Sequence, residues 1–316
     1  MVWESICDRK LNVPDALLRE KIRGFLEEDI GLGDITTELI VPSGVKVRAE
    51  IIVKEMAVVA GLDEARMVFE IVGASFTPNV KNGDEVSPNT SIAIIRGEGR
   101  SILSAERTAL NLLSRMSGIA TETRRLIRKI GEAGLNIRIA ATRKTAPGLR
   151  YFDKKAVAIG GGDPHRFRLD DQILIKDNHI AIAGSLEEAL KKALSSKSFS
   201  KKIEVEARTV EDAIKAARLG ADIIMLDNMS VKDVRRVIDA LKELGLRDKV
   251  LIEVSGEITE NNILDYASLG PDIISVGAIT HSAKSIDMSL EIVEIEGVNP
   301  QLELSLRNPP NNLYDC

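Results

Sequence analysis

The sequence predicts an α/β protein with a small α+β domain followed by a parallel α/β barrel. Its 316 residues correspond to two domains at roughly 150 residues per domain. Residues 45–102 alternate Val- and Ile-rich stretches with turn signals, which is typical of short strands. Beyond residue 135, short and continuously apolar strands alternate with helical segments, which is typical of a parallel sheet buried on both faces.

The elements of the first domain follow from periodicity and turn signals. Apolar side chains at helical spacing predict a helix near the start of the chain. Asn82-Gly83 marks a tight turn ahead of a later strand. The predicted elements are a helix over 14–28, a strand over 45–59 that ends at Gly61, a helix over 62–72 and a strand over 90–96.

A long helix over 104–130 connects the two predicted domains. Ser104 is the expected N-cap, Gly118 is a possible interruption, and Gly131 follows the end. We therefore expect an N-terminal domain over 1–111 and a catalytic barrel over 112–284, with the segment 285–316 able to pack back on the first domain.

The barrel is predicted from its repeated strand and helix pattern. An open, doubly wound sheet stays the structural alternative, but no Gly-x-Gly-x-x-Gly follows a strand, so a dinucleotide site is not supported. The predicted strands are 203–207, 222–226, 250–254 and 272–276, and the helices between them are 210–219, 231–244 and 260–269.

Composition excludes several classes of protein. The net charge of -5 argues against a general nucleic-acid binder. Cys7 and Cys316 do not form a disulfide framework, which fits a reducing compartment. There is no secretory signal pattern and no apolar run near the ~18 residues of a membrane span. The cytoplasm is the expected location.

Polar and small residues gather at the predicted strand ends. Glu206 ends one strand, Asp227 follows the next, and Ser255-Gly256 and Gly277-Ala278 follow the last two. The ends of parallel barrel strands meet at one rim, where carboxylates suit Mg²⁺ and Gly-rich turns suit a phosphate. The alternative is that each acid caps the next helix; the coincidence of two acids and two turns favours a site.

A basic cluster lies inside this acidic protein. Residues 143–176 hold eight Lys and Arg against four Asp, interleaved with Gly- and Pro-containing loops. A local excess of positive charge attracts anions. We assign Lys154 and Lys155 to the surface.

All three histidines fall in predicted strand-end loops. His165 is favoured as a site residue because it adjoins Arg166. His179 is left open between a structural and a functional role. His281 is expected either to help bind a phosphate or to satisfy a neighbouring backbone group.

These residues fall in segments that match a known family. The chain resembles the quinolinate phosphoribosyltransferases (nicotinate-nucleotide pyrophosphorylases, carboxylating) from Gly33-Asp-Ile-Thr-Thr37 to Asp287-Met-Ser-Leu290. Its segments are Ala105-Glu-Arg-Thr-Ala-Leu-Asn111, Ala141-Thr-Arg-Lys-Thr-Ala-Pro-Gly148, Gly160-Gly-Gly-Asp-Pro-His-Arg166, Leu174-Ile-Lys-Asp-Asn-His179, Glu204-Val-Glu206, Leu226-Asp-Asn228, Glu253-Val-Ser-Gly256 and Ser275-Val-Gly-Ala-Ile-Thr-His-Ser282. One departure is Pro164, where many members have Asn; it could stiffen the turn that aims His165.

The resemblance implies a fold and an assembly. The fold is an N-terminal α/β sandwich with an incomplete α/β barrel, of the type II phosphoribosyltransferase kind. The assembly is a homodimer or a hexamer whose active site is completed by the neighbouring subunit, through Arg107.

The resemblance also implies the reaction and its residues. Quinolinate takes phosphoribosyl from phosphoribosyl pyrophosphate (PRPP) and loses CO₂, giving nicotinate mononucleotide and pyrophosphate for NAD biosynthesis. Lys144, Lys176, Glu206 and Asp227 are the implied catalytic residues, with Mg²⁺ as cofactor near the two acids. The implied substrate-binding residues are Arg107, Thr142, Arg143, Lys144, His165, Arg166, Lys176, Glu206, Asp227, Ser255, Gly256, Glu257, Val276, Gly277, Ala278 and His281.

Three alternatives stay open at this point. A related enzyme could use nicotinate or another base and release no CO₂. A non-catalytic phosphate-sugar sensor on the same barrel should lack one of the acids or lysines. A phosphate-binding lyase or aldolase would share the phosphate site without the anion pocket.

Overall fold

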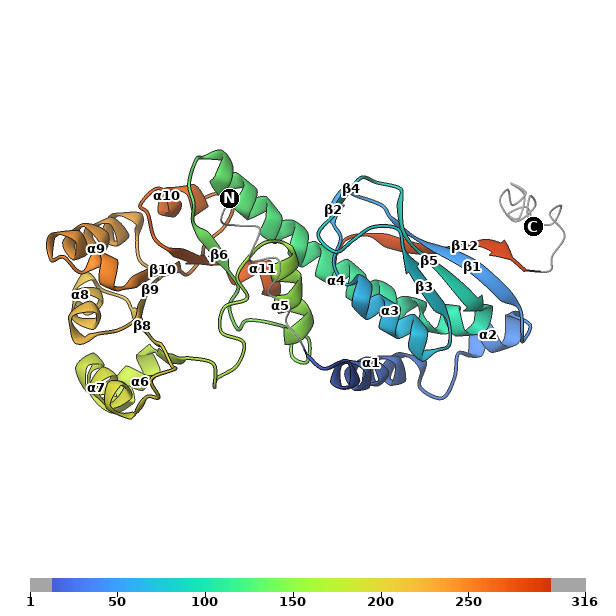
Figure 1. Ribbon diagram of the computed structural model, residues 1–316, viewed down its shortest axis with the longest axis horizontal. Coiled ribbons are helices and arrows are strands. Elements are labelled where there is room, and N and C mark those ends of the chain that lie inside the picture. The colour runs from blue at the N-terminus through green and yellow to red at the C-terminus, as the bar shows by residue number, and fades with distance from the viewer. Residues whose placement is uncertain (1–12, 297–316) are drawn as a thin grey trace, which may run out of the picture. The chain divides into compact units, whose positions relative to one another are not determined.

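The computed structural model describes residues 13–296, which form two compact units (Figure 1). Residues 119–284 make the barrel unit, and the described residues up to Gly118 together with those from Ser285 make the N-terminal unit. The division falls at Gly118, later than the expected boundary at Asn111. Cys7 and Cys316 lie outside the described residues, as does the segment 297–316.

The N-terminal unit is built on a four-stranded antiparallel sheet with the order β12-β1-β5-β3. Burial alternates along β1, so one face of that strand lies in the core. The last described segment, β12, pairs with β1 and so returns to this unit. The strands are β1 (Lys46–Val53), β3 (Ser75–Pro78), β5 (Thr90–Glu98) and β12 (Met288–Ile295).

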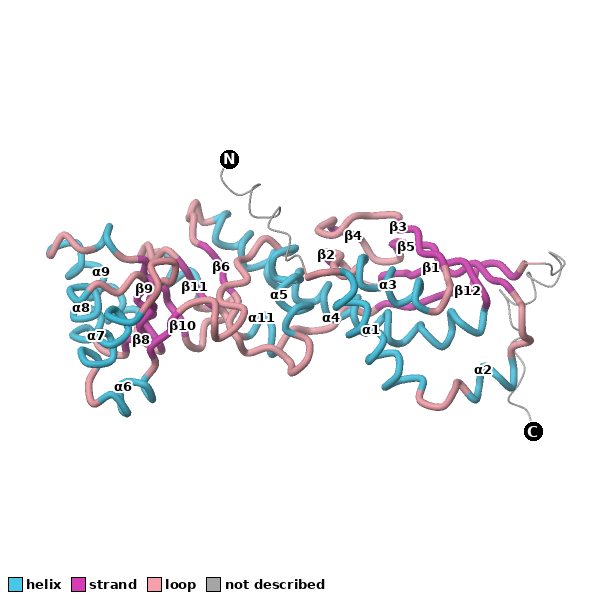
Figure 2. The backbone as a smooth tube through the Cα atoms, turned by 60° about the horizontal axis from the view of Figure 1, so that its bottom comes forward, coloured by secondary structure: helices cyan, strands magenta, loops and turns pink. Residues whose placement is uncertain are grey.

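Three shorter helices and a two-stranded sheet complete this unit. α3 packs against α1 and β3 (Figure 2). The predicted strand 45–59 is divided, because its last part pairs in the small sheet instead. The elements are α1 (Asp15–Ile30), α2 (Ile35–Ile40), α3 (Leu62–Ile71), β2 (Ala57–Val58) and β4 (Glu85–Val86).

The long helix α4 (Gly99–Glu132) corrects two expectations. It begins at Gly99, so Ser104 is not its N-cap; the Ser104 hydroxyl donates to Asp34 Oδ2 at 3.1 Å instead. Gly118 does not interrupt the helix. A helical glycine costs about 1 kcal/mol relative to alanine, and burial of the flanking apolar side chains Met116 and Ile119 offsets that cost.

The barrel unit contains six parallel strands in the order β6-β11-β10-β9-β8-β7. Within the described residues β6 and β7 do not pair with each other, so the sheet is an incomplete barrel, as expected. The strands are β6 (Arg138–Ala140), β7 (Ile173–Ile175), β8 (Ile203–Ala207), β9 (Ile223–Asp227), β10 (Leu251–Ser255) and β11 (Ile273–Ser275).

Helices connect the strands of this unit: α8 packs against β8 and β9 (Figure 2), and α7 packs against β7. Ser185, Thr209 and Ser230 cap α7, α8 and α9 by accepting backbone N–H groups of the first turn. The predicted helix 260–269 is reduced to the short α10. The helices are α5 (Arg150–Ile159), α6 (Asp177–Ala183), α7 (Leu186–Ser196), α8 (Val210–Leu219), α9 (Val231–Glu243), α10 (Ile263–Ala267) and α11 (Ala278–His281), with a 3₁₀ turn at Arg247–Lys249.

Candidate active site

Two acids meet at the carboxyl ends of β8 and β9. The Glu206 side chain is 5% exposed, and its Oε2 accepts from Lys176 Nζ at 2.7 Å. The Arg208 guanidinium lies 3.5 Å from Glu206 Oε1 and 3.8 Å from Asp227 Oδ2. The two carboxylates therefore share a cation, and the space between them suits positive charge.

The alternative role of these acids, helix capping, is excluded by the structure. Thr209 caps the helix after Glu206, and Ser230 caps the helix after Asp227. Asp227 Oδ2 instead accepts from Asn228 Nδ2 at 2.8 Å. Neither acid is committed to a helix N-terminus.

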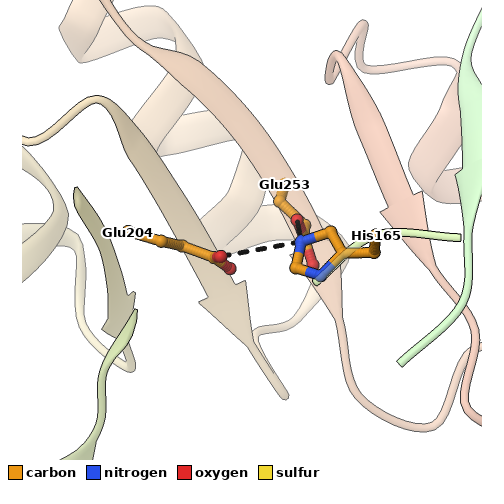
Figure 3. Close-up of side chains that lie close together, drawn as sticks. All are labelled: His165, Glu204 and Glu253. Atoms are coloured by element: carbon orange, nitrogen blue, oxygen red, sulfur yellow. Dashed lines mark hydrogen bonds and ion pairs between the residues drawn. The ribbon is translucent and has the colours of Figure 1, made fainter. Parts of the chain in front are cut away.

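Two glutamates from strands of the same sheet and His165 from the loop after α5 form a second, buried group (Figure 3). His165 Nε2 lies 3.1 Å from Glu253 Oε2 and 3.6 Å from Glu204 Oε2. Both glutamates have fully buried side chains. Burial, and next the Glu253 charge, raise the pKa of Glu204 to about 8. Glu204 Oε2 also accepts from Gln172 Nε2.

Glu204 and Glu253 were not among the residues predicted for the site. A signal for them exists in the sequence, because each is an acid inside an otherwise apolar strand. Glu204 and Glu206 are two residues apart and share a face of the sheet. The strand register places Glu206 and Glu253 on either side of Met225, so all three acids lie on that face.

Two arginines, the buried Arg166 and the partly buried Arg143, lie near this group and are considered together as a cationic pocket for an anionic ligand. Arg166 is 8% exposed and donates from Nη1 to the Gln172 carbonyl at 3.3 Å. Burial, and then the charge of Arg143, lower the pKa of Arg166. The Nε of Arg143 is buried without a hydrogen-bond partner in the described part of the chain. Buried donors without partners are costly, so an anionic ligand is expected here.

Lys154 is fully buried, so its assignment to the surface was wrong. Its Nζ donates to the Pro164 carbonyl and, at 2.8 Å, to the Arg166 carbonyl. The 160–166 loop folds back over α5 and covers it, which charge alone could not reveal. Burial, and next the Arg150 charge, lower the pKa of Lys154 to about 8. Lys155 is half-buried.

The turn that carries His165 is held at several points. His165 has a φ of 54°, an unusual value for a residue with a side chain. Its backbone N–H donates to Asp163 Oδ1 at 2.7 Å, and the Pro164 carbonyl is fixed by Lys154. This clamp holds His165 and Arg166 in place.

Glycines mark close backbone approaches after β10 and β11. A Cβ on Gly256 would lie 2.2 Å from Asn228 Oδ1 and 2.7 Å from the Asn228 backbone nitrogen, so no other residue fits. Asn228 and Glu257 both have positive φ values, which tightens these turns. A Cβ on Gly277 would lie 3.2 Å from His281 Nε2 and 3.3 Å from Lys144 Cδ.

The remaining predicted residues complete the rim. The Thr142 hydroxyl accepts from the Lys144 N–H at 3.1 Å, and the Lys144 carbonyl accepts from the Thr280 hydroxyl at 2.8 Å. Ser255 ends β10, while Val276 and Gly277 link β11 to α11, which begins at Ala278. His281 Nδ1 lies 2.6 Å from Ser282 Oγ.

Arg107, a predicted site residue, and His179, whose role was left open, stand apart from this arrangement. His179 Nδ1 accepts the Lys176 N–H at 3.0 Å and so closes the first turn of α6, which is a structural role. Arg107 lies on α4 in the N-terminal unit, so it is not among the residues that the barrel unit brings together.

Both units of the chain match models of known protein domains, and the chain is similar in sequence to known enzymes. Residues 34–117 match the model of the quinolinate phosphoribosyl transferase N-terminal domain, and residues 119–291 match that of the C-terminal domain. A probable nicotinate-nucleotide pyrophosphorylase [carboxylating] of Methanothermobacter thermautotrophicus is 48% identical over 86% of this chain and 97% of its own. The Bacillus subtilis protein of the same name is 39% identical over 87% and 93% of the two chains.

A solved structure of a similarly named enzyme has the same fold as this chain. The nicotinate-nucleotide pyrophosphorylase from Francisella tularensis superposes with a TM-score of 0.82 and 38% identity, covering 89% of this chain and 98% of that one. Family models span both units, and relatives match over nearly their whole length. The chain therefore belongs to the quinolinate phosphoribosyl transferase family.

Proposed function

We propose that this enzyme transfers phosphoribosyl from PRPP to quinolinate with loss of CO₂, giving nicotinate mononucleotide and pyrophosphate. The family and its similarly named relatives support this reaction. The observation that carries it is the placement of Arg166, which is buried, and Arg143, whose Nε is buried without a partner among the described residues, in the same barrel unit as the Lys176–Glu206 pair. One region can therefore bind a diacid and stabilise charge on a sugar.

Quinolinate suits the arginine pocket. It carries two adjacent ring carboxylates, and an arginine guanidinium matches a carboxylate with two parallel hydrogen bonds. Arg143 offers a buried donor without a partner, and Arg166 keeps its charge in a desolvated position. A dicarboxylate supplies the negative charge that both cations require, whereas nicotinate supplies half of it.

The residues at the rim fit a magnesium ion. Glu206 and Asp227 present carboxylates to one cation, Arg208, and hard oxygen ligands of this kind are those that Mg²⁺ takes in substrate-phosphate sites. We propose that these two acids hold the ion, directly or through water. Bound there, it would neutralise the pyrophosphate of the donor as that group departs.

The turns after β10 and β11 are the proposed 5′-phosphate cradle. A Cβ at Gly256 would collide with Asn228, and a Cβ at Gly277 would crowd the His281 and Lys144 side chains, so both turns suit a backbone without a side chain. Free backbone N–H groups in such turns bind phosphate oxygens. We assign Ser255, Glu257, Val276, Ala278 and His281 to this region of the substrate site.

The reaction follows from these positions. The bond from the ribose carbon C1′ to pyrophosphate breaks, and the carboxylates of Glu206 and Asp227 stabilise the positive charge on the sugar. The pyridine nitrogen of quinolinate then bonds to C1′ and becomes cationic. The bond to the 2-carboxylate breaks next, and its electron pair passes to the ring carbon.

A proton must then reach that ring carbon. Lys144 and Lys176 are the candidate donors from the chain, together with water. Lys176 lies against Glu206 and Lys144 lies beside Gly277, so both are near the proposed reacting atoms. Holding the two substrates in line supplies roughly 7–11 kcal/mol of the barrier reduction in such reactions.

The assembly is proposed from the family resemblance. We propose a homodimer or a hexamer in which Arg107 of a neighbouring subunit reaches the quinolinate site. No helix in the described residues is long and apolar enough to cross a membrane. The cytoplasmic location stays a prediction.

The direct experiment is incubation of the purified enzyme with PRPP, Mg²⁺ and either quinolinate or nicotinate. Nicotinate mononucleotide from quinolinate, with little or none from nicotinate, is the expected result. Product from nicotinate alone would instead identify a related phosphoribosyltransferase. Binding of PRPP without any product would identify a sensor.

A further inference from the structure

We propose that Glu253, together with Glu204, holds His165 as a positively charged and fixed group that binds a carboxylate of quinolinate through Nδ1. Glu253 is then a positioning residue, because it acts on the substrate through His165. This inference rests on the proposed function for the identity of the ligand. The geometry of the three residues stands independently of it (Figure 3).

The position of the two glutamates is fixed by the sheet. Glu204 belongs to β8 and Glu253 to β10, and each lies between apolar residues that are themselves buried. A carboxylate on a central strand cannot swing out to water without breaking the strand. Both side chains therefore stay beside the His165 ring, with Glu253 Oε2 at 3.1 Å and Glu204 Oε2 at 3.6 Å from Nε2.

The charge balance of this buried group favours a protonated histidine. Oε1 of Glu204 and Oε1 of Glu253 are buried without hydrogen-bond partners in the described part of the chain. A buried carboxylate is costly unless a cation or a proton compensates it. His165 Nε2 contacts the other oxygen, Oε2, of each carboxyl group, so a positive charge on the ring compensates the negative charge buried there.

The groups that face His165 shift its pKa in opposite directions, and the two acids have the larger effect. Burial lowers the pKa of His165, as does the charge of Lys154 from α5. The hydrogen bond and charge of Glu253, with the charge of Glu204, outweigh them, so the pKa is raised above its ordinary value. Asp163, on the same loop as His165, binds the backbone N–H rather than the ring.

The protonation state decides what His165 can bind. With Nε2 donating to Glu253, a neutral ring would present an unprotonated Nδ1, whose lone pair repels a carboxylate. A protonated ring presents an N–H at Nδ1 and adds a charge-assisted hydrogen bond. Nδ1 makes no hydrogen bond within the described residues, so it is available to a ligand.

The test begins with the histidine itself. The full chain is labelled with ¹⁵N-histidine, and both ring nitrogens of His165 are followed by NMR from pH 5 to pH 9. His165→Gln identifies the signal among the three histidines. We expect protonation at both nitrogens at pH 7 and a midpoint above the ordinary value of about 6.5. A neutral His165 at pH 7 in the unmodified enzyme overturns the proposal, whether or not any variant folds.

Glu253→Gln tests the cause. It keeps the shape and removes the charge, and we expect the His165 midpoint to fall by about one pH unit or more. Glu260→Gln is the matched control, since Glu260 belongs to the same unit but pairs with Arg125 at 2.6 Å. An unchanged midpoint in Glu253→Gln, or an equal shift in the control, contradicts the proposal.

Kinetics then separate positioning from general damage. For Glu253→Gln we expect the KM for quinolinate to rise about tenfold at pH 7, where the unmodified enzyme keeps its histidine protonated, and less at pH 5, where the variant's histidine is protonated as well. The KM for PRPP and kcat should change little. A loss in kcat alone contradicts the proposal. The NMR titration needs no turnover, so its result is valid even if the enzyme does not use quinolinate. Conversely, an enzyme that converts quinolinate with a neutral His165 would contradict this inference and leave the proposed function intact.

Discussion

Lys176 Nζ and Glu206 Oε2 lie 2.7 Å apart, so the basic segment and the rim acids are joined directly. Glu206 is also within 3.5 Å of Arg208, which in turn reaches Asp227. Lys176, one of the cations expected to hold substrate anions, therefore belongs to the same network of contacts as the two acids expected to stabilise the sugar. An arrangement with the acids on the opposite face would have excluded the proposed chemistry.

Arg166→Ala should weaken quinolinate binding. Loss of a charged hydrogen bond costs roughly 1.5–3 kcal/mol, which corresponds to a KM higher by about 10- to 150-fold. Arg168→Ala is the matched control, since Arg168 lies two residues after Arg166 but is exposed, with its guanidinium over the ring of Phe167. An Arg166→Ala enzyme with unchanged KM for quinolinate would refute the assignment of Arg166 to the pocket.

Glu206→Gln should lower kcat rather than substrate affinity, because a carboxylate near C1′ acts most strongly on the charge that develops in the transition state. We expect a loss of about 100-fold, as for removal of one preorganised electrostatic group. Steady-state kinetics check this, with Glu211→Gln on the exposed side of α8 as the control. Full kcat in Glu206→Gln would remove this residue from the mechanism.

Gly256→Ala should disrupt the phosphate cradle, because the added methyl group would collide with Asn228. Gly220→Ala is a close control: the φ values are 96° and 95°, and nothing lies within 4 Å of a Cβ at Gly220. Both variants pay the conformational cost of a positive φ. A rise in the KM for PRPP confined to Gly256→Ala is expected, and equal effects in both would show that backbone strain alone is responsible.

Lys154→Met should loosen the turn that carries His165 and Arg166. Two carbonyl groups lose their donor, so the KM for quinolinate should rise while the protein still folds. The pH dependence of unfolding gives a second readout. Because the folded pKa is about 8 against an ordinary 10.5, the unfolded chain binds more protons between these values.

The sign of that dependence follows directly. Between pH 8 and pH 10.5, the free energy of unfolding of the unmodified enzyme should rise relative to that of Lys154→Met, and the penalty for burying the charged amine is fully present below pH 8. Urea unfolding at a series of pH values measures the difference. Parallel curves for the two proteins would show that Lys154 is not desolvated as the structure has it.

Four of the six barrel strands could be predicted from the sequence because they are continuous apolar runs, whereas β6 and β7 have only three residues each and were not predicted. Residues 203–207 match β8 throughout, and 222–226 differ from β9 by one residue at each end. The short β3 has one buried residue in four and so gave no apolar run to detect. Ser104 resembled an N-cap, but its hydroxyl serves Asp34, a residue distant in the sequence.

The site was only partly predictable, because the sequence indicates where strands end but not which distant segments cover or face one another. Residues at strand ends could be assigned to a common rim, since parallel strands end together. The burial of Lys154 depends on the loop that folds over it, and charge is normally a sign of exposure. Glu204 and Glu253 serve His165 across the sheet, and that contact depends on strand order, which the sequence pattern does not specify.

The central claim is that the cationic pocket orients quinolinate so that its 2-carboxylate leaves. Quinolinate carrying ¹³C in the 2-carboxyl group, or separately in the 3-carboxyl group, tests this in the presence of PRPP and Mg²⁺. We predict one labelled CO₂ for each nicotinate mononucleotide from the 2-labelled substrate and none from the 3-labelled one. Nucleotide formed without CO₂, or label released from the 3-position, would contradict it.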